Sequence, residues 1–419
     1  ETRIDFDDVR PPGKIQIKVT QEDSGEGLDA SISILSGNKP LIGYFGKNRF
    51  FTELDDIGEI TEGIAPGGYV FEISAGGGFV TKPQQVELVV EPGELHAVNS
   101  VIAVTASPQN RGWYSADLHH HSDVLDGFTE AEYVFRSELS SGVDISFLSD
   151  HDSVVNNAEM RVMADERGMQ FIPGTELSPS WAHFNAFPLD AGKTVEIDTG
   201  QATVQEIFAA ARNMGAELIE ANHPYSNYGY FEALEKNAVP GGFDPNFELV
   251  EIVAPGAGGN DKTLTRVWEM WNDGQRVYLA GGSDVHDVWL EDSGSSRTYV
   301  YVTGDLNIEN FVSGLRAGHA FASQGPLVYP EIMFGSDIDH SADEPLVLSY
   351  TIQAVSGLRS AKLIEGGAEI NEITFDGVDT EVPIEFAVSP ESSSWYSLVV
   401  EDMNGRFAYT NPVWVSADR

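Results

Sequence analysis

Apolar and polar residues alternate along the first quarter of the chain. The runs "KIQIKV", "LDASISIL", "YVFEIS" and "QQVELVV" are short and rich in β-branched residues, and each has a period of two. Turn-forming clusters such as "EDSGEG", "APGG" and "EPGE" separate them. Because no run of helical period lies between them, residues 1–110 are predicted to form a small β-sandwich.

The pattern changes between residues 111 and 327. Apolar runs that are typical of strands, among them "VDISFL", "AELIEA", "FELVEIV" and "RVYLAGG", alternate with amphipathic stretches of helical period. One such stretch has Thr129 as its predicted N-cap and ends at Gly142. The repeated order of strand and helix predicts a βα barrel or a doubly wound sheet.

The β pattern returns from residue 328 to residue 419. The runs "LVLSYTIQAV", "TEVPIEFAV" and "SSWYSLVVED" again read as strands, and they predict a second β-sandwich. The predicted fold class is therefore multi-domain: a central α/β domain flanked by N-terminal and C-terminal β-sandwich domains.

The charge balance limits the partners of the chain. The 24 Lys and Arg residues face 66 Asp and Glu residues, which gives a formal net charge of −42. Such a field repels DNA, RNA and anionic membrane surfaces, so we expect neither nucleic acid nor membrane as a partner. The chain has no cysteine, so any metal must be held by His, Asp and Glu. An anionic small-molecule substrate would need bound cations to overcome the acidic field.

Two further features concern location. No stretch approaches the roughly 18 unbroken apolar residues that a membrane span requires. No signal peptide is visible, but the chain begins with Glu1 rather than Met. Together with the acidic composition and the flanking β modules, this favours a secreted or periplasmic protein.

The stretch "WYSADLHHHSDVLDGF" carries the first candidate metal ligands. In an extended segment, side chains at positions i and i+2 point to the same side, so His119 and His121 are predicted to converge and His120 to face away. A single His-x-His pair is only weak evidence for a metal site. It gains weight because six of the ten histidines, and several carboxylates, follow predicted strands. The further residues at strand ends are Asp150, His151, Glu176, His183, His223, Asp284 and His286.

Polar side chains at the carboxyl ends of barrel strands are the usual position of an active site. Imidazoles and carboxylates together suit Zn, Mn, Fe or Co. A structural zinc ion closes its coordination with four protein ligands, whereas a cluster of about nine shared ligands leaves positions for water. The sequence therefore favours a catalytic cluster of divalent metal ions.

The order "DLHHH…D…SDH…TEL…H…NHP…SDVH" resembles the PHP (polymerase and histidinol phosphatase) superfamily of metal-dependent hydrolases over roughly residues 112–327. The runs "LRAGHAFASQGP" and "RTYVYV" are similar to its carbaryl-hydrolase branch, the CehA/McbA type, and the first section is similar to carboxypeptidase-regulatory-like β-sandwiches. The resemblance implies a distorted seven-stranded βα barrel that holds up to three metals.

The resemblance also implies how nine ligands divide among these metals. The first metal would take His119, His121, Glu176 and Asp284; the second would take Glu176, as a bridge, with His183 and His223; and the third would take Asp126, His151 and His286. Many relatives carry His where this chain has Asp126, and this difference affects the third metal site. Asp126 could instead belong to a plain turn.

Other polar and aromatic residues are candidates for supporting roles. Arg297, in "SSRTYVYV", could bind a substrate phosphate through its guanidinium, or form a surface salt bridge. Asp117 lies two residues before His119, so its side chain is predicted to point to the same side. It could fix the tautomer of the His119 imidazole, or cap a strand end. Tyr225 is a weaker pocket candidate, and Trp289 could line the substrate entrance or pack in the core.

These features predict a hydrolase. Two divalent ions lower the pKa of the water that bridges them to near neutrality, so the resulting hydroxide could attack a phosphate ester. The leading interpretation is a metal-dependent phosphoesterase that acts on small organic phosphate mono- or diesters. The same centre could cleave a carbamate or carboxylic ester. In a third interpretation, the chain is a non-catalytic extracellular binding module.

Overall fold

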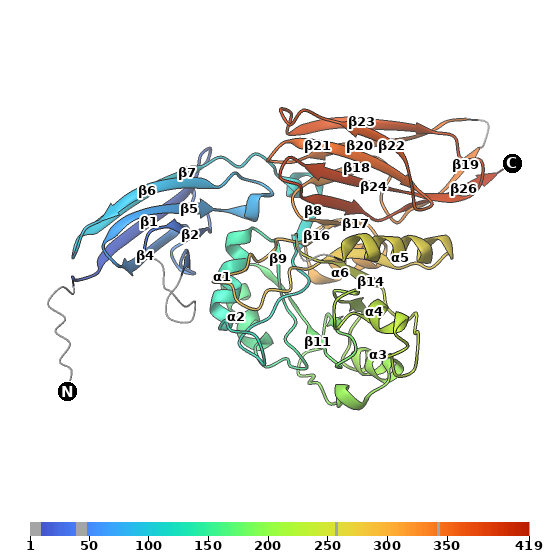
Figure 1. Ribbon diagram of the computed structural model, residues 1–419, viewed down its shortest axis with the longest axis horizontal. Coiled ribbons are helices and arrows are strands. Elements are labelled where there is room, and N and C mark those ends of the chain that lie inside the picture. Colours follow the sequence, from blue (N-terminus) through green and yellow to red (C-terminus); the bar gives the residue numbers. More distant parts are fainter. Residues whose placement is uncertain (1–9, 39–47, 256–258, 342–343, 419) are drawn as a thin grey trace.

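The structure is a computed structural model that describes residues 10–38, 48–255, 259–341 and 344–418. Seven strands before residue 103 form two sheets, with the orders β4-β1-β7 and β3-β2-β5-β6. Figure 1 shows these strands at one end of the molecule. They are β1 Gly13–Gln21, β2 Ser31–Ser36, β3 Arg49–Phe51, β4 Glu59–Ile64, β5 Gly67–Ser74, β6 Gln84–Val90 and β7 Leu95–Ile102.

The apolar positions of these two sheets face one another, as the alternation predicts. Ile15 and Ile17 of β1 are buried against Ile32 of β2 and against Phe71 and Ile73 of β5. The burial alternates from Gly13 to Val19 of β1 because successive side chains point to opposite faces of a strand. The two sheets therefore share one core of their own.

The central section contains all six α-helices of the described residues and two further sets of strands. The helices are α1 Ala131–Ser141, α2 Asn157–Arg167, α3 Val204–Asn213, α4 Tyr230–Glu235, α5 Asn260–Asn272 and α6 Ile308–Arg316. The strands are β8 Trp113–Ala116, β9 Ile145–Leu148, β10 Gln170–Pro173, β11 Thr175–Leu177, β12 Phe184–Phe187, β13 Leu218–Ala221, β14 Leu249–Ile252, β15 Tyr278–Gly281, β16 Arg297–Tyr301 and β17 Ala320–Ser323.

The described strands do not by themselves show the expected distorted seven-stranded βα barrel, which stays a prediction. They belong to two sheets, which contain β10-β9-β8-β16-β17 and β11-β12-β13-β14-β15. Strand β12 is antiparallel to both of its neighbours, and β16 is antiparallel to β8 and β17. No helix separates β10, β11 and β12. The apolar runs predicted strands correctly but carried no information on their direction.

The predicted glycine at the end of α1 is confirmed, whereas its predicted N-cap is not. Helices α1 and α2 end at Gly142 and Gly168, which adopt the left-handed conformation with φ of 72° and 66°. The prediction that Thr129 caps α1 was wrong, because Glu130 occupies the N-cap position. The Thr129 hydroxyl instead accepts a hydrogen bond from the backbone N–H of Val288, at 3.2 Å.

The C-terminal section is all β and continues a central sheet. Its strands are β18 Leu327–Pro330, β19 Asp337–Ser341, β20 Leu346–Gln353, β21 Leu358–Glu365, β22 Ala368–Thr374, β23 Glu381–Val388, β24 Ser394–Asp402, β25 Phe407–Thr410 and β26 Val413–Asp418. Strand β25 pairs with β17, so one sheet of 11 strands crosses residue 327. Trp395 also packs on Trp271 of α5, with ring centroids 4.9 Å apart. The division into three domains at residues 110 and 327 stays a prediction.

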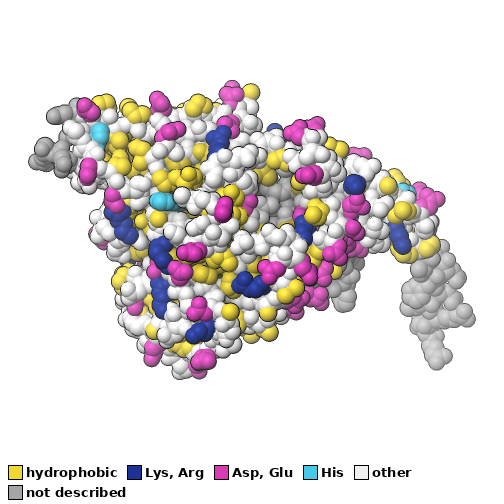
Figure 2. All heavy atoms as spheres, turned by 180° about the vertical axis from the view of Figure 1, so that it is seen from behind, with side chains coloured by type: hydrophobic (Ala, Val, Ile, Leu, Met, Phe, Trp, Pro, Cys, Tyr) yellow, Lys and Arg dark blue, Asp and Glu magenta, His cyan; other side chains and the backbone are white. Residues whose placement is uncertain are grey.

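Arginines of the central section reach the loops of the N-terminal sheets. Arg136 of α1 donates to the Thr52 carbonyl at 3.0 Å, and Arg167 of α2 donates to the Leu54 carbonyl at 3.0 Å. Across the described residues, no helix is long and apolar enough to cross a membrane. Figure 2 shows Asp and Glu side chains spread over one face of the molecule, with a few Lys and Arg side chains between them.

Candidate metal centre

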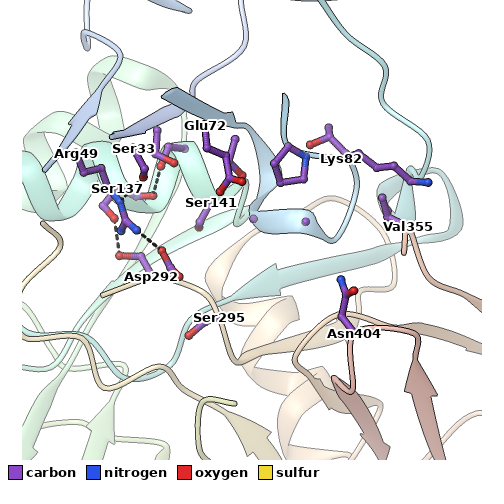
Figure 3. A pocket seen from close by; sticks show the side chains of 18 of the residues that line it. Ser33, Arg49, Glu72, Lys82, Ser137, Ser141, Asp292, Ser295, Val355 and Asn404 are labelled. Atoms are coloured by element: carbon purple, nitrogen blue, oxygen red, sulfur yellow. Dashed lines mark hydrogen bonds and ion pairs between the residues drawn. The ribbon is translucent and has the colours of Figure 1, made fainter. Parts of the chain in front are cut away.

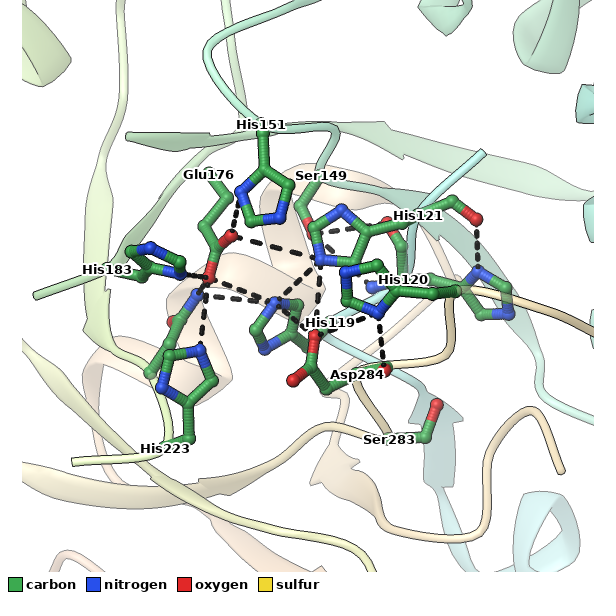
Figure 4. Close-up of polar contacts among 12 residues, drawn as sticks. His119, His120, His121, Ser149, His151, Glu176, His183, His223, Ser283 and Asp284 are labelled. Carbon is green, nitrogen blue, oxygen red and sulfur yellow. Dashed lines mark hydrogen bonds and ion pairs between the residues drawn. The ribbon is translucent and has the colours of Figure 1, made fainter. Parts of the chain in front are cut away.

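The candidate site lies where the two central sheets approach each other. Beyond the ends of β8 and β9, an isolated bridge pairs His120 with Val285, and a second pairs His151 with Glu176. Both bridges are parallel, so the segments that follow the strand ends run side by side. Figure 4 shows the imidazoles converging on Glu176 and Asp284 at this position.

His119 and His121 point to one side, as the strand parity predicts. Their Nε2 atoms are 3.1 Å apart, and both side chains are fully buried. The Asp284 Oδ1 atom lies 3.1 Å from His119 Nε2 and 3.2 Å from His121 Nε2. Glu176 Oε1 lies 3.1 Å from His119 Nε2. Four potential ligand groups therefore surround one position.

Glu176 is the centre of the arrangement. Its side chain is fully buried, and its Oε1 atom lies 3.3 Å from His183 Nδ1 and 3.4 Å from His223 Nε2. Its Oε2 atom lies 2.6 Å from His151 Nδ1. Asn222 donates a hydrogen bond of 2.6 Å to Oε1. One carboxylate thus contacts imidazoles on both of its oxygens, as a bridging ligand must.

The remaining predicted ligands lie on the outer side of this group. Asp126 Oδ1 is 3.2 Å from His151 Nε2 and 3.6 Å from His286 Nε2, although the Asp126 side chain is 67% exposed. The His286 and His121 rings stack with centroids 4.1 Å apart. The structure therefore brings all nine predicted metal ligands together, and their roles as ligands stay predictions.

The donor atoms fit divalent cations. The side chains form four groups in which ligand atoms lie within 4.8 Å of one another: His119, His121 and Glu176; His151, Glu176 and His183; His119, His223 and Asp284; and His121, His151 and His286. Asp284 Oδ1 is buried and accepts no hydrogen bond from the described residues. Nitrogen and carboxylate donors of this kind suit Zn, Mn or Fe, and a buried acceptor without a donor suits a cation.

The electrostatics keep the central carboxylate ionised. Burial alone would raise the pKa of Glu176, but His183 and His119 hold it well below its usual range. Burial would likewise lower the pKa of His119, but Asp284, Glu251 and Glu176 raise it well above its usual range. The pKa of His121 is lowered to about 3, mainly by burial, so His121 is neutral and has a free lone pair for a metal.

Backbone strain also marks the site. His223 and Asp284 have φ of 27° and 55°, which place non-glycine residues in or near the left-handed region. Such conformations cost on the order of 1–3 kcal/mol each and persist only where the surroundings enforce them. The strain coincides with two of the predicted ligands.

Two buried acids near His119 were missed by the sequence analysis. Glu251 Oε1 lies 2.9 Å from His119 Nδ1, and Glu251 also accepts a hydrogen bond from the His223 backbone N–H. Glu220 is fully buried, and its oxygens have no hydrogen-bond partner among the described residues. Burial and the Glu251 carboxylate raise the pKa of Glu220 well above its usual range. The signal was an acid inside an otherwise apolar strand, in "LIEA" and "LVEI".

Glu251 therefore takes the position that had been predicted for Asp117. Asp117 is buried, but its carboxylate accepts hydrogen bonds from the Ser283 hydroxyl and from the backbone N–H groups of Ser283 and Gly294, the latter two at 2.8 and 2.7 Å. The expectation that it fixes the His119 tautomer is corrected, because it holds the loops after β15 instead. A side chain on Gly282 would lie 2.5 Å from Glu251 Oε1, so glycine permits this close approach.

Replacing Glu251 with Gln is expected to weaken metal binding by about 10–100-fold, the usual cost of losing a carboxylate that orients a metal-binding imidazole. Isothermal titration calorimetry of the purified variant with the metal measures this change. Glu248→Gln, in the same strand region but paired with Arg212, is the matched control. An unchanged affinity for Glu251→Gln would show that His119 needs no such partner.

Arg297 does not lie at the cluster. Its side chain is buried, its Nε donates to the Gly294 carbonyl at 2.9 Å and its Nη2 to the Ser141 carbonyl at 2.9 Å. The guanidinium carbon lies 3.8 Å from the centroid of the Phe79 ring. The expected phosphate contact is therefore corrected, because the backbone of β16 directs this side chain toward the N-terminal section.

The structure places the weaker candidates Tyr225 and Trp289 in different surroundings. Tyr225 lines the cavity at the cluster, whereas Trp289 packs against Phe51 and Tyr133 with centroids 5.6 and 4.7 Å apart. His120 is buried and faces away, as predicted, with its Nε2 2.7 Å from the Ser293 hydroxyl. Core packing is thus the correct alternative for Trp289.

A cavity of about 830 Å³ opens onto the cluster. Its lining includes Asp126, His151, His183, His223, Asp284 and His286. The aromatic ring of Tyr228 also lines it and stacks on His183 with centroids 4.8 Å apart. The volume suits a small-molecule substrate, and the ligand groups form one of its walls.

Comparisons with known proteins give partial matches. No family model matches the chain. It is 32% identical over 108 residues to a 3',5'-nucleoside bisphosphate phosphatase of Chromobacterium violaceum, which covers 24% of this chain and 37% of that protein. It is 34% identical over 65 residues to a 5'-3' exoribonuclease of Haemophilus influenzae, which covers 16% of this chain and 24% of that protein. The chain thus spans only about a quarter to a third of these relatives.

Among solved structures, the chain is similar to a two-domain protein of Bacteroides vulgatus that contains a predicted PHP-like metal-dependent phosphoesterase. The match has a TM-score of 0.43 and 14% identity, and it covers 73% of this chain and 95% of that one. None of these matches tests the narrower resemblance to the carbaryl-hydrolase branch. Among the described residues, the groups of His and carboxylate side chains could bind divalent metal ions.

Proposed function

We propose that this chain is a metal-dependent hydrolase of small phosphate esters. The observation that carries the proposal is the position of Glu176, whose two oxygens contact imidazoles from separate segments on one wall of an open cavity. The names of the two curated relatives, a bisphosphate phosphatase and an exoribonuclease, support phosphate ester chemistry. The net charge of −42 favours a small ester over a nucleic acid polymer.

We further propose membership of the PHP superfamily, with the two central sheets as the halves of a distorted barrel. The order of His and carboxylate residues along the chain, from His119 to His286, supports this assignment. The proposed division into an N-terminal, a central and a C-terminal domain places the ligand residues in the central one.

The residues of the chain have separate tasks in this reaction. The nine side chains would hold two to three divalent ions, which lower the pKa of water and offset the charge of the phosphate. Asn222 fixes the rotamer of Glu176 through its 2.6 Å hydrogen bond. Glu251 orients His119, and Asp117 holds the loops beside Asp284. Tyr228 and Tyr225 form an aromatic wall for the ester group.

The test is hydrolysis of chromogenic phosphate monoesters and diesters by the chain with and without added Mn or Zn. We expect turnover of at least one class that depends on the metal. Aryl carbamates and carboxylic esters serve as competing substrates. Faster turnover of those esters would assign the centre to carbonyl chemistry, and no turnover of any ester would contradict the proposal.

A further inference from the structure

A second cavity of about 690 Å³ lies where the N-terminal strands, α1 and the C-terminal section meet. Figure 3 shows side chains from all three parts around it, among them Ser33 and Glu72 of the N-terminal strands, Ser137 and Ser141 of α1, and Asn404 near the end of the chain. None of these residues belongs to the metal cluster. The cavity is therefore a separate feature that the reaction described above does not use.

The floor of this cavity is a polar sheet face. Strand pairing places Phe51, Ser31 and Ser74 in one row across β3, β2 and β5, and it places Arg49, Ser33 and Glu72 in the next row. The opposite face of the same strands carries the apolar core. The face that lines the cavity is half-exposed and carries hydroxyl and charged groups, which a polar ligand in the cavity can contact.

The second cavity borders the first. Pro255, Asp292 and Ser295 line both of them. Ser137 and Ser293 line the second cavity with their hydroxyls 2.6 Å apart, and the Ser293 hydroxyl lies 2.7 Å from Nε2 of His120. A substrate that reached from the cluster into the second cavity would pass along the three shared residues.

The chemistry of the lining indicates the ligand class. Nine of the lining residues are serines, and a serine hydroxyl can both donate and accept a hydrogen bond. Two of the three lining cations are already neutralised, since Arg49 pairs with Asp292 at 2.5 Å and Arg406 with Asp402 at 2.9 Å. The remaining lining cation, Lys82, is matched in number by the lining acid Glu72. This balance suits a neutral, polyhydroxylated group better than a second phosphate.

We infer that the second cavity binds the sugar or polyol part of the phosphate ester whose phosphate is cleaved at the metal cluster. The inference rests on the proposed function and names its substrate class. The N-terminal strands then have a direct part in substrate selection, because they supply the floor of the cavity.

The test fills the cavity from its floor. The double variant Ser31→Leu, Ser74→Leu replaces two cross-strand partners that face the cavity. Metal-loaded protein is assayed with glucose 6-phosphate, trehalose 6-phosphate and p-nitrophenyl phosphate. We expect KM for the two sugar phosphates to rise at least about 10-fold more than KM for p-nitrophenyl phosphate, as the loss of two hydrogen bonds predicts. Equal changes for all three substrates would overturn the inference.

Two controls separate fold, function and inference. Ser36→Leu changes an exposed serine of the same strand that does not line the cavity, and the milder pair Ser31→Ala, Ser74→Ala covers the case in which the leucines prevent folding. Binding of trehalose, observed by saturation-transfer NMR, needs no turnover. If no ester is cleaved but trehalose binds to the parent chain and not to the double variant, the proposed function fails and the cavity assignment holds. If esters are cleaved but neither trehalose nor a sugar phosphate binds, only the inference fails.

Discussion

Replacing Glu176 with Gln is expected to lower kcat/KM for phosphate ester hydrolysis by more than about 100-fold. Loss of an outer-shell carboxylate typically costs 10–100-fold in metal affinity or activity, and Glu176 contacts the candidate ligands directly. The substitution keeps the size of the side chain but removes the negative charge that offsets the surrounding imidazoles and cations. Steady-state kinetics with p-nitrophenyl phosphate, together with metal-to-protein stoichiometry, measures the effect.

The matched control is Glu166→Gln, an exposed residue of α2. It has the same change of charge and no contact with the cluster, so its activity is expected to stay within about two-fold of the parent chain, as for most surface substitutions. A Glu176→Gln variant that kept both its metal content and its activity would show that Glu176 is not a metal ligand.

The position of the cluster could be predicted because it follows from strand geometry. Parity placed His119 and His121 on the same side of an extended segment, and their Nε2 atoms do lie 3.1 Å apart. The residues after β9, β13 and β15 needed only the rule that polar side chains at strand ends gather at one edge. That rule holds although the strands belong to two sheets, because two bridges join the segments after β8 and β9 to Val285 and to Glu176.

The supporting residues could not be predicted from the same rule. Glu251 and Glu220 lie inside strands rather than after them, and the pattern of the strand shows that they are buried but not what they contact. Along the chain, Arg297 comes soon after Asp284 and His286, so the sequence suggested that it lies near the cluster. Its direction depends on the packing of Phe79 from a distant section, which no local pattern contains.

The pairing between the central and C-terminal sections could not be read from the sequence for a similar reason. A change in periodicity marked residue 327, yet β17 pairs with β25 across that position. Periodicity reports the local element, whereas the pairing of two edges depends on contacts between residues far apart in the chain. The strand direction of β12 and β16 was unpredictable on the same ground.

Divalent metal is expected to stabilise the chain as well as activate it. The cluster gathers ionised and neutral ligands in a buried position, and a cation that binds only the folded chain stabilises it by about 2.7 kcal/mol when its free concentration is 100 times Kd. Chelation with EDTA should therefore lower the urea midpoint and abolish hydrolysis, and added Mn or Zn should restore both. The rise of the urea midpoint on metal addition should be smaller at pH 6 than at pH 8. The pKa values of His119, His151 and His223 are raised, so protons compete with the metal for these imidazoles as the pH falls.

The variant Glu176→Gln distinguishes specific binding from a general effect of salt. Its urea midpoint should respond to Mn or Zn much less than that of the parent chain, whereas Glu166→Gln should respond fully. Calcium chloride at equal ionic strength controls for screening of the −42 net charge, since nitrogen-rich sites bind Ca²⁺ poorly. If Ca²⁺ raised the midpoint as much as Mn, or if Glu176→Gln responded like the parent chain, the stabilisation would come from the acidic surface, and the imidazole cluster would hold no metal.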